Sequence, residues 1–416
     1  EKKAQKRTTN YNYRTMIKQK THIKFVLFFG ICLSAFNSYG QNLQTYIDEA
    51  ITNSPEIQKV QFQYEIASEK VNEANWLPNT EVSAGYFVSE PETRVGAQRA
   101  RLSLKQMIPW FGTISARENY ASSMAAAQYE ELVIAKRKLI VSVSQSYYNL
   151  MANKAKQEVL EQNIQLLETY ERLALTSVEV GKASAVSVLR LQIRQNELQQ
   201  TKEVLQQQYL AEQAIFNNLL NRDNDMEVVV MSDLTIPAEI DIISEENLKV
   251  HPELTKYDKI YESVSQSELL NQKESSPMLG FGLDYIPVSE RTDMTLIDNG
   301  KDILMPMVTL SIPIFNNKYK SQTKQNQLKQ QEITSQKEER LNALQTMLSK
   351  AIYDRNSARI SYDTQSKNLK QAEDAEEILI KNYETGTIDF NDVLDIQELQ
   401  LKFQINQIES VKTYYV

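Results

Sequence analysis

The sequence predicts a mainly α-helical protein of long paired helices that also contributes a few strands to a membrane β-barrel. The 416 residues include only 10 Gly and 10 Pro, about half of average usage. Three stretches contain neither residue, namely 113–180, 182–236 and 314–385. As one helix the last stretch would be about 108 Å long, several times the width of a compact domain. A conventional globular enzyme is therefore not expected, and the composition also excludes collagen-like and disulfide-scaffold classes.

The first 40 residues differ in kind from the rest. They carry eight Lys or Arg and one acid, so they have a charge of +7 and the remainder of this −8 chain has −15. From Met16, basic residues precede the apolar run 25–36, and Ser38 and Gly40 are the small residues that a signal peptidase reads. We expect a secretory signal cleaved after Gly40, with an upstream extension at 1–15. A short membrane anchor is disfavoured, because twelve apolar residues fall short of the ~20 that span a bilayer.

Few residues can carry chemistry. The one cysteine, Cys32, lies in the predicted signal, which leaves the mature chain without a disulfide, a thiolate nucleophile or a cysteine metal site. Only His251 remains of two histidines, and because it precedes Pro252 we predict a helix-boundary role rather than a ligand. Phosphate-binding Gly loops, nucleophile elbows and HExxH are absent from the sequence. We therefore expect no enzymatic activity, no cofactor and no metal site, and the acidic mature chain argues against nucleic acid.

The helical stretches show apolar residues at helical spacing, for example Leu341, Leu344 and Leu348. Each helix can bury only a narrow stripe, so packing against other long helices is implied. Four segments alternate like strands instead, and they are 82–88, 100–111, 279–285 and 308–315. Each has about the length that crosses a bilayer as a tilted strand. Four strands cannot close a barrel, but several chains together can, since an open edge in lipid leaves backbone groups unpaired.

The chain also repeats itself, as shown by four recurring pairs of segments. They are Ser54-Pro55-Glu56 with His251-Pro252-Glu253, Leu77-Pro78 with Ser276-Pro277, 108–111 with 312–315, and 180–183 with 385–388. The predicted domains are accordingly the extension and signal at 1–40, a first repeat at 41–220, a joining segment at 221–250 and a second repeat at 251–416. Each repeat reads helix, strand, strand, long helix, Gly turn, helix.

Five segments then point to a known family. They are Asn-Ser-Pro-Glu-Ile at 53–57, Asn-Trp-Leu-Pro at 75–78, Asn-Leu-Leu-Asn-Arg at 218–222, His-Pro-Glu-Leu at 251–254 and Tyr-Glu-Thr-Gly-Thr-Ile-Asp-Phe-Asn-Asp-Val-Leu-Asp at 383–395. In order and spacing they resemble the TolC family of outer-membrane efflux channels over essentially all of 41–416. Residues 107–112 are most similar to channels paired with heavy-metal pumps, the CusC/CzcC-like branch. Asn221 stands where relatives often have Gly, and Asn also tolerates left-handed backbone geometry.

The resemblance implies a homotrimer in the outer membrane of a Gram-negative bacterium. Four strands from each chain would form a twelve-stranded β-barrel surrounded by outer-membrane lipid, and a twelve-helix α-barrel would continue it through the periplasm. The implied function is the outer-membrane channel of a tripartite efflux system, which conducts substrates passively. Its implied partners are a periplasmic adaptor protein and an inner-membrane pump of the resistance-nodulation-division type.

Two glycines, Gly181 and Gly386, each interrupt a helical pattern, and Gly suits a reversal between antiparallel helices. By resemblance these turns are the periplasmic tips on which the adaptor docks, with Val180 and Lys182 at one turn and Thr385 and Thr387 at the other. Trp110 and Phe111 end a predicted strand, so we expect them at the membrane interface.

Asp392 and Asp395 are three residues apart and therefore share one helix face. The resemblance implies that they line a periplasmic gate, where six carboxylates of a trimer would narrow the mouth and attract cations. The alternative is an ordinary solvated face with acids near a helix start, where the dipole favours them.

Two other functions compete with the channel. A periplasmic adaptor also has a coiled-coil hairpin, but it normally adds Gly-rich β-domains that this Gly-poor chain lacks. A purely structural coiled-coil protein would have no use for four strands of bilayer length.

Overall fold

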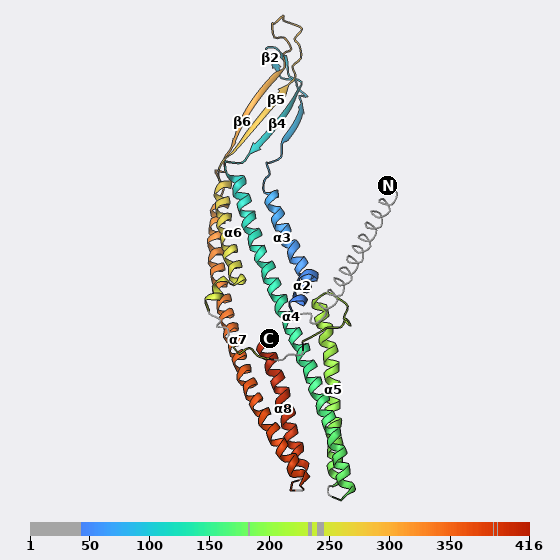
Figure 1. The fold of residues 1–416 in the computed structure, drawn as a ribbon. Helices are drawn as coiled ribbons and strands as arrows, with labels where there is room; N and C mark the ends of the chain where they lie inside the picture. Colours follow the sequence, from blue (N-terminus) through green and yellow to red (C-terminus); the bar gives the residue numbers. More distant parts are fainter. Residues whose placement is uncertain (1–42, 182–183, 232–234, 239–244, 386, 389) are drawn as a thin grey trace, which may run out of the picture. The chain divides into compact units, whose positions relative to one another are not determined.

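The computed structural model describes residues 43–181, 184–231, 235–238, 245–385, 387–388 and 390–416. In chain order the elements are α2 (Leu43–Asn53), α3 (Pro55–Glu73), β1 (Glu81–Tyr86), β2 (Glu92–Thr93), β3 (Gly96–Ala97), β4 (Ala100–Ile108), α4 (Thr113–Glu179), α5 (Ala185–Leu219), η1 (Glu245–Val250), α6 (Pro252–Glu274), β5 (Met278–Ile286), β6 (Ile303–Ser311), α7 (Lys318–Glu384) and α8 (Phe390–Tyr415). The chain is mainly helical, as predicted (Figure 1).

By packing, the chain divides into two compact units. One contains the described residues up to Thr52 together with Ile140–Ile236 and Arg355–Val416, and the other contains Asn53–Leu139 and Pro237–Asp354. Each unit thus combines segments from both halves of the sequence, so neither unit coincides with one repeat.

The predicted long helices are confirmed. α4 and α7 contain 67 residues each, which corresponds to about 100 Å of helix. α5 ends at Leu219, and Asn221 follows with a φ of 55°. This left-handed geometry ends the helix, so the Asn fulfils the role that Gly commonly has at such an end. Among the described residues, no helix is both long and apolar enough to cross a membrane.

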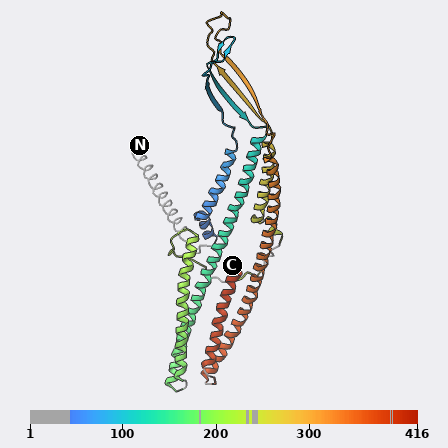
Figure 2. The same ribbon diagram turned by 180° about the vertical axis from the view of Figure 1, so that it is seen from behind.

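The four long strands form one antiparallel sheet in the order β1-β4-β5-β6, and the strands lie side by side in both views (Figures 1 and 2). Successive cross-strand rows alternate in character because side chains alternate between the faces of a sheet. One row consists of Val82, Leu104, Leu283 and Pro306, and the next consists of Ser83, Ser103, Asp284 and Met305. One face is therefore largely apolar and exposed, whereas the other carries polar groups, including an ion pair between Arg101 and the buried Asp284.

The strand boundaries differ from the prediction at several ends. The bounds predicted for the last strand, 308–315, are wrong. β6 begins earlier, at Ile303, and ends at Ser311. Pro306 interrupts the sequence alternation, yet β6 contains it, because a proline is tolerated on an edge strand of a sheet. β4 ends at Ile108 before Pro109, and β1 has only 6 residues. The small β2–β3 hairpin was not predicted.

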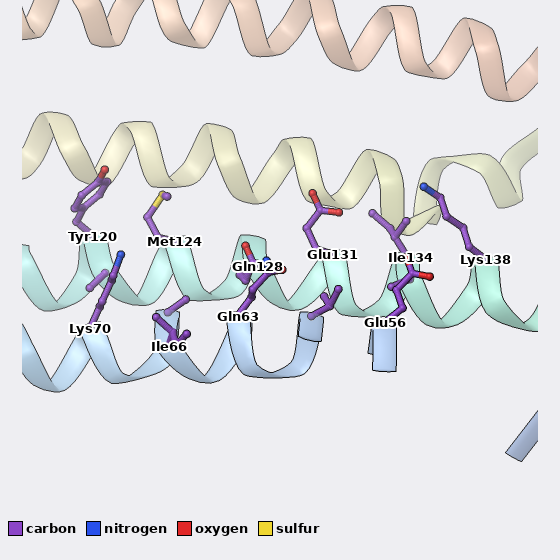
Figure 3. Close-up of a pocket in the computed structure, with 14 residues that line it drawn as sticks. Glu56, Gln63, Ile66, Lys70, Tyr120, Met124, Gln128, Glu131, Ile134 and Lys138 are labelled. Atoms are coloured by element: carbon purple, nitrogen blue, oxygen red, sulfur yellow. Dashed lines mark hydrogen bonds between the residues drawn. The ribbon is translucent and has the colours of Figure 1, made fainter. Parts of the chain in front are cut away.

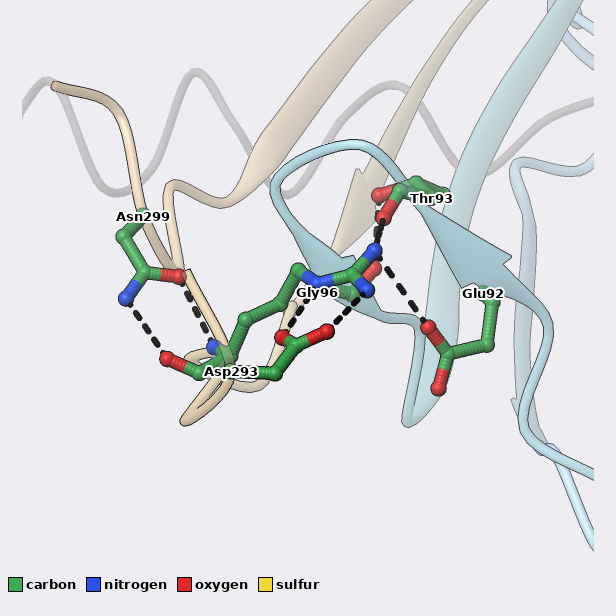
Figure 4. Close-up of polar contacts among 6 residues, drawn as sticks. Glu92, Thr93, Gly96, Asp293 and Asn299 are labelled. Atoms are coloured by element: carbon green, nitrogen blue, oxygen red, sulfur yellow. Dashed lines mark hydrogen bonds and ion pairs between the residues drawn. The ribbon is translucent and has the colours of Figure 1, made fainter. Parts of the chain in front are cut away.

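Arg291 joins two loops at one end of the sheet, and Figure 4 labels its partners Glu92, Thr93, Asp293 and Asn299. Its guanidinium donates to both carboxylate oxygens of Asp293 at 2.7 and 2.9 Å and to the Thr93 carbonyl at 3.3 Å, and it lies 3.6 Å from Glu92. The Asn299 side chain exchanges two hydrogen bonds with the Arg291 backbone, at 2.8 and 2.9 Å. The loop after β5 is thus fastened to the β2–β3 hairpin.

Two of the repeated motifs are helix starts. Ser54 caps α3 and His251 caps α6, each followed by a proline in the first turn, where the missing N–H costs nothing. The Nδ1 atom of His251 accepts from the backbone N–H of Glu253 at 3.3 Å, which confirms the helix-boundary role predicted for it. Burial lowers the pKa of His251, so the ring is neutral near pH 7 and keeps Nδ1 as an acceptor.

The segment after α5 is held by side chains that bond to its backbone. The Tyr46 hydroxyl accepts from the N–H of Val229 at 3.0 Å and donates to its carbonyl at 3.2 Å. Val228 and Val230 are buried while Val229 and Met231 are exposed. This alternation is typical of extended chain, so residues 228–231 of the joining segment run as extended chain.

Candidate functional site

The turn after α4 has the geometry that the sequence predicted for Gly181. This residue has a φ of 72°, which favours glycine, and its N–H donates to the Val178 carbonyl at 3.0 Å. Val180 is exposed beside it. Lys182 lies outside the described residues, so its predicted role at this tip stays a prediction.

The turn after α7 is organised by one carbonyl. The Asn382 oxygen accepts from the Thr385 hydroxyl at 2.9 Å, from the Thr387 hydroxyl at 2.8 Å and from the Thr387 N–H at 3.0 Å. Both threonines are exposed. Gly386 lies outside the described residues. The threonines predicted at this tip thus close the turn, and docking of an adaptor there stays a prediction.

The start of α8 is fixed by aromatic packing. Phe390 is 3% exposed and stacks edge to face on Tyr170 of α4 and Tyr383 of α7, with ring centroids 5.5 and 5.0 Å apart. Val393, one turn later, is fully buried in the same cluster. Because Phe390 and Val393 occupy the inner side of α8, the residues between them are directed away from the cluster.

Asp392 and Asp395 are accordingly both exposed. Asp392 lies in the first turn of α8, where the helix dipole favours a carboxylate. Asp395 lines a groove of about 310 Å³ between α5 and α8. The two predicted gate residues therefore share an open helix face, and no described basic side chain forms an ion pair with either.

Two arginines lie at the same groove, and the sequence analysis did not assign them to the site. Arg190 donates to the Asn391 side chain at 2.8 Å, and Arg194 lies 3.6 Å from Glu398. Both line the groove together with Asp395. The sequence did contain a signal for Arg190, because an alignment of the two repeats places it at the position equivalent to Asp395. The charge at the groove is therefore mixed rather than purely acidic.

Further along α8, one carboxylate connects three helices. Glu376 of α7 accepts from Tyr170 of α4 at 2.9 Å and from Gln397 and Gln400 of α8, both at 2.8 Å. Both glutamines are buried. Burial and the Glu376 carboxylate raise the pKa of Tyr170 well above its ordinary value. This cluster fastens the α7–α8 hairpin to α4 with neutral donors only.

Replacing Glu376 by Ala should lower the unfolding free energy by about 2–4 kcal/mol, because three buried donors lose a charged acceptor. The neighbour Glu377 is exposed and pairs only with Lys381 at 2.5 Å, so Glu377→Ala should cost less than about 0.5 kcal/mol. Thermal unfolding followed by circular dichroism compares the two variants. Equal shifts in both would contradict the connecting role of Glu376.

A second groove, of about 720 Å³, runs between α3 and α4. Ile66 and Met124 line it from opposite helices, with Lys70 and Glu131 among its charged residues (Figure 3). Glu131 is already bound by Lys256 of α6. The lining residues include no histidine or cysteine, and the described residues contain no group of three or more His, Cys, Asp or Glu that could hold a metal.

Trp110 and Phe111 follow the end of β4 and contact each other edge to face, with centroids 5.8 Å apart. Phe111 is 77% exposed and Trp110 is 36% exposed. Large aromatic side chains exposed at a strand end fit the interface position predicted for them, which stays a prediction.

The chain is similar to known proteins in part of its sequence and in its fold. The family model described as "Outer membrane efflux protein" matches residues 46–222, and a search of curated proteins finds no match. Several solved structures share the fold. VceC from Vibrio cholerae is 17% identical with a TM-score of 0.67, covering 90% of this chain and 93% of that one.

Two further structures agree. CusC is 15% identical with a TM-score of 0.70, covering 91% and 92% of the two chains. The open state of the Neisseria gonorrhoeae MtrE channel is 14% identical with a TM-score of 0.66, covering 90% and 88%. The chain is thus similar to outer membrane efflux proteins over residues 46–222, and it shares the fold of long helices and a four-stranded sheet with these structures.

Proposed function

We propose that this protein is the outer-membrane channel of a tripartite efflux system and conducts its substrates passively, without catalysing a reaction. The observation that carries the proposal is the sheet, in which apolar and polar rows alternate over strands that lead directly into helices of about 100 Å. An apolar outer face suits lipid and a polar inner face suits a water-filled lumen. The family match and the shared fold support the same function.

The proposed assembly is a homotrimer with a twelve-stranded barrel and a twelve-helix tunnel. β1 and β6 are the two edge strands of the sheet, and in lipid each would leave a row of backbone groups unpaired. Pairing β1 of one copy with β6 of the next removes both edges. Three copies of four strands give the twelve strands expected from the family resemblance.

Exposed apolar stripes on the helices support the same assembly. Leu328, Tyr353, Ile360 and Ile378 lie within about 40° of one another on α7, and all are exposed. A second stripe on α5 consists of Val186, Ile193, Val204 and Ile215, again within about 40° and exposed. Such stripes on a single chain are typical of surfaces that a further subunit covers. We assign them to contacts between copies.

The proposed location is the outer membrane, with the helices extending into the periplasm. The proposed partners are a periplasmic adaptor at the tips around Gly181 and Thr385 and an inner-membrane pump of the resistance-nodulation-division type. CmeC from Campylobacter jejuni and MtrE are both described as outer membrane channels, which supports this location. The proposal that the chain belongs to the heavy-metal branch rests on the sequence of residues 107–112 alone.

The test is to express the full chain and to examine its fractionation, its migration on gels with and without heating, and its conductance in planar bilayers. The proposal expects heat-modifiable trimers in the outer-membrane fraction and a steady ionic conductance. A soluble periplasmic monomer without conductance would support the adaptor or the structural coiled coil instead, and would overturn the channel.

A further inference from the structure

Three helices begin or end at the same end of the sheet, where β4 and β6 end and β5 begins. Ile108, the last residue of β4, pairs with Leu279, and Met278, the first residue of β5, pairs with Ser311, the last residue of β6. At this end of the sheet the chain therefore passes from β4 into α4 and from β6 into α7, and it enters β5 from α6. We call the described residues 109–117, 271–277 and 312–324 the collar.

Side chains hold these helix ends together. The Asn271 amide of α6 donates to the Tyr319 carbonyl at 3.0 Å and to the Thr323 hydroxyl at 3.1 Å, both on α7. Arg117 of α4 lies 3.4 Å from Glu274 of α6. The collar is thus one connected structure in which the helix ends keep fixed positions.

The collar has exposed apolar side chains next to the sheet. Phe111, Ile312, Ile314 and Phe315 are all exposed, and Phe315 is exposed completely. Four large apolar residues in two short connections are costly in water. They favour a place at the lipid boundary, where the apolar face of the sheet also ends.

The first two turns of α7 then carry three exposed lysines, Lys318, Lys320 and Lys324. None of them forms an ion pair with a described residue, although 18 such pairs occur elsewhere in the described chain. The first turn contains no acid, so Lys318 and Lys320 stand near the positive end of the helix dipole, where a cation is unfavourable. A nearby anion would offset this cost.

Lys320 and Lys324 are directed away from α6, whereas Lys318 lies over the Tyr319 ring, 5.7 Å from its centroid. Tyr319 and Thr323 form the side of α7 that contacts α6, and Lys320 and Lys324 lie four residues apart on a different side. Lys324 is about 9 Å along the helix from Lys318, which is about one Debye length at physiological ionic strength. All three charges can therefore act on a surface at the level of Phe315.

We propose that the collar binds the anionic headgroups of phospholipids in the leaflet that borders the helical end of the barrel. The apolar side chains of the collar enter the leaflet, and the lysines bind the headgroup phosphates with their aliphatic parts along the lipid. This inference rests on the proposed channel function, because it places the sheet in the membrane. Beyond the channel function, the proposal names the class of lipid, anionic phospholipid, that the protein binds preferentially.

The test uses the purified full chain in detergent, supplied with equal amounts of phosphatidylglycerol and phosphatidylcholine. Retained lipid is counted by native mass spectrometry. A lysine near an anionic surface contributes about 1 kcal/mol, which is about a fivefold effect. The triple variant Lys318→Gln, Lys320→Gln, Lys324→Gln should therefore lose at least about tenfold of the preference for phosphatidylglycerol.

A matched variant controls for total charge. Lys350→Gln, Lys370→Gln and Lys402→Gln also remove three exposed lysines, and Lys350 and Lys370 lie about 48 and 78 Å along α7 from Lys318. This variant should keep the wild-type preference. Glycerol phosphate, which has the headgroup charge without acyl chains, should not compete at equal concentration.

Gels of the same samples separate the two proposals. Wild-type trimers without any lipid preference, or an unchanged preference in the collar variant, would overturn the collar and leave the channel standing. A wild-type chain that forms no trimer would overturn both.

Discussion

Replacing Ile360 by Glu should abolish the trimer while leaving the helices of the single chain folded. Ile360 is 68% exposed in one chain and lies in the apolar stripe of α7. Because most of this side chain has no partner within the described chain, the substitution removes little packing from the monomer. Its main effect should appear in assembly.

The expected size follows from burial. Covering one isoleucine side chain contributes about 1.5–3 kcal/mol, and a trimer buries it three times. A carboxylate in the same place must lose its water, which costs several kcal/mol more for each copy. For three copies these losses come to roughly 10 kcal/mol or more, so trimers should not be detected.

The matched control is Gln336→Glu. It adds the same acid to an exposed position of α7, about 120° around the helix from Ile360. This variant should form trimers as the wild type does. Heat-modifiable migration on gels reports the assembly, and circular dichroism reports the helices. If Ile360→Glu forms stable trimers, the stripe does not lie between copies.

Much of the fold could be predicted from the sequence because its signals are local. Absence of Gly and Pro predicted the two 67-residue helices, and the paired motifs at Ser54 and His251 are helix caps whose chemistry is readable in three residues. Asn221 was predicted to tolerate the left-handed geometry that it has. Each of these features depends on a residue and its immediate neighbours.

The predictions that failed depend on pairing across the chain. The limits of β6 follow from its register with β5, which allows Pro306 at the edge of the sheet; alternation along the sequence alone does not reveal this. The contact of Arg190 with Asn391 likewise depends on the packing of α5 against α8, although the alignment of the two repeats relates Arg190 to Asp395. The Glu376 cluster joins residues more than 200 positions apart, and no motif marks it.

Exchanging Asp392 and Asp395 together for Asn should weaken the block of the channel by trivalent cations at least about tenfold. In the proposed trimer the change removes six carboxylates from the proposed gate. A trivalent ion about 10 Å from one carboxylate gains roughly 1 kcal/mol in water before screening, so six carboxylates outweigh the salt screening. Asn keeps the shape of the side chain, and both residues are exposed, so the fold should be unchanged.

Removing a positive charge at the groove should have the opposite effect on the cation block. Arg190 contacts Asn391 and lines the groove with Asp395, and its charge partly offsets the carboxylates there. Arg190→Gln should therefore strengthen the block by trivalent cations. Asp223→Asn with Asp225→Asn controls for net charge, because these exposed acids follow the far end of α5. Asp225 lies beside Gln213, about 35 Å along α5 from Arg190.

Planar-bilayer recordings at several concentrations of a trivalent cation distinguish the outcomes. A gate role requires that the Asp392 and Asp395 variant weakens the block, that Arg190→Gln strengthens it and that the control changes neither. An unchanged block in the first variant would mean that the two aspartates form an ordinary solvated helix face. Weakening in the control as well would assign the effect to the overall charge of the protein rather than to a ring at the mouth. The opposite signs at Asp395 and Arg190 matter most, since a general loss of stability would move both variants in the same direction.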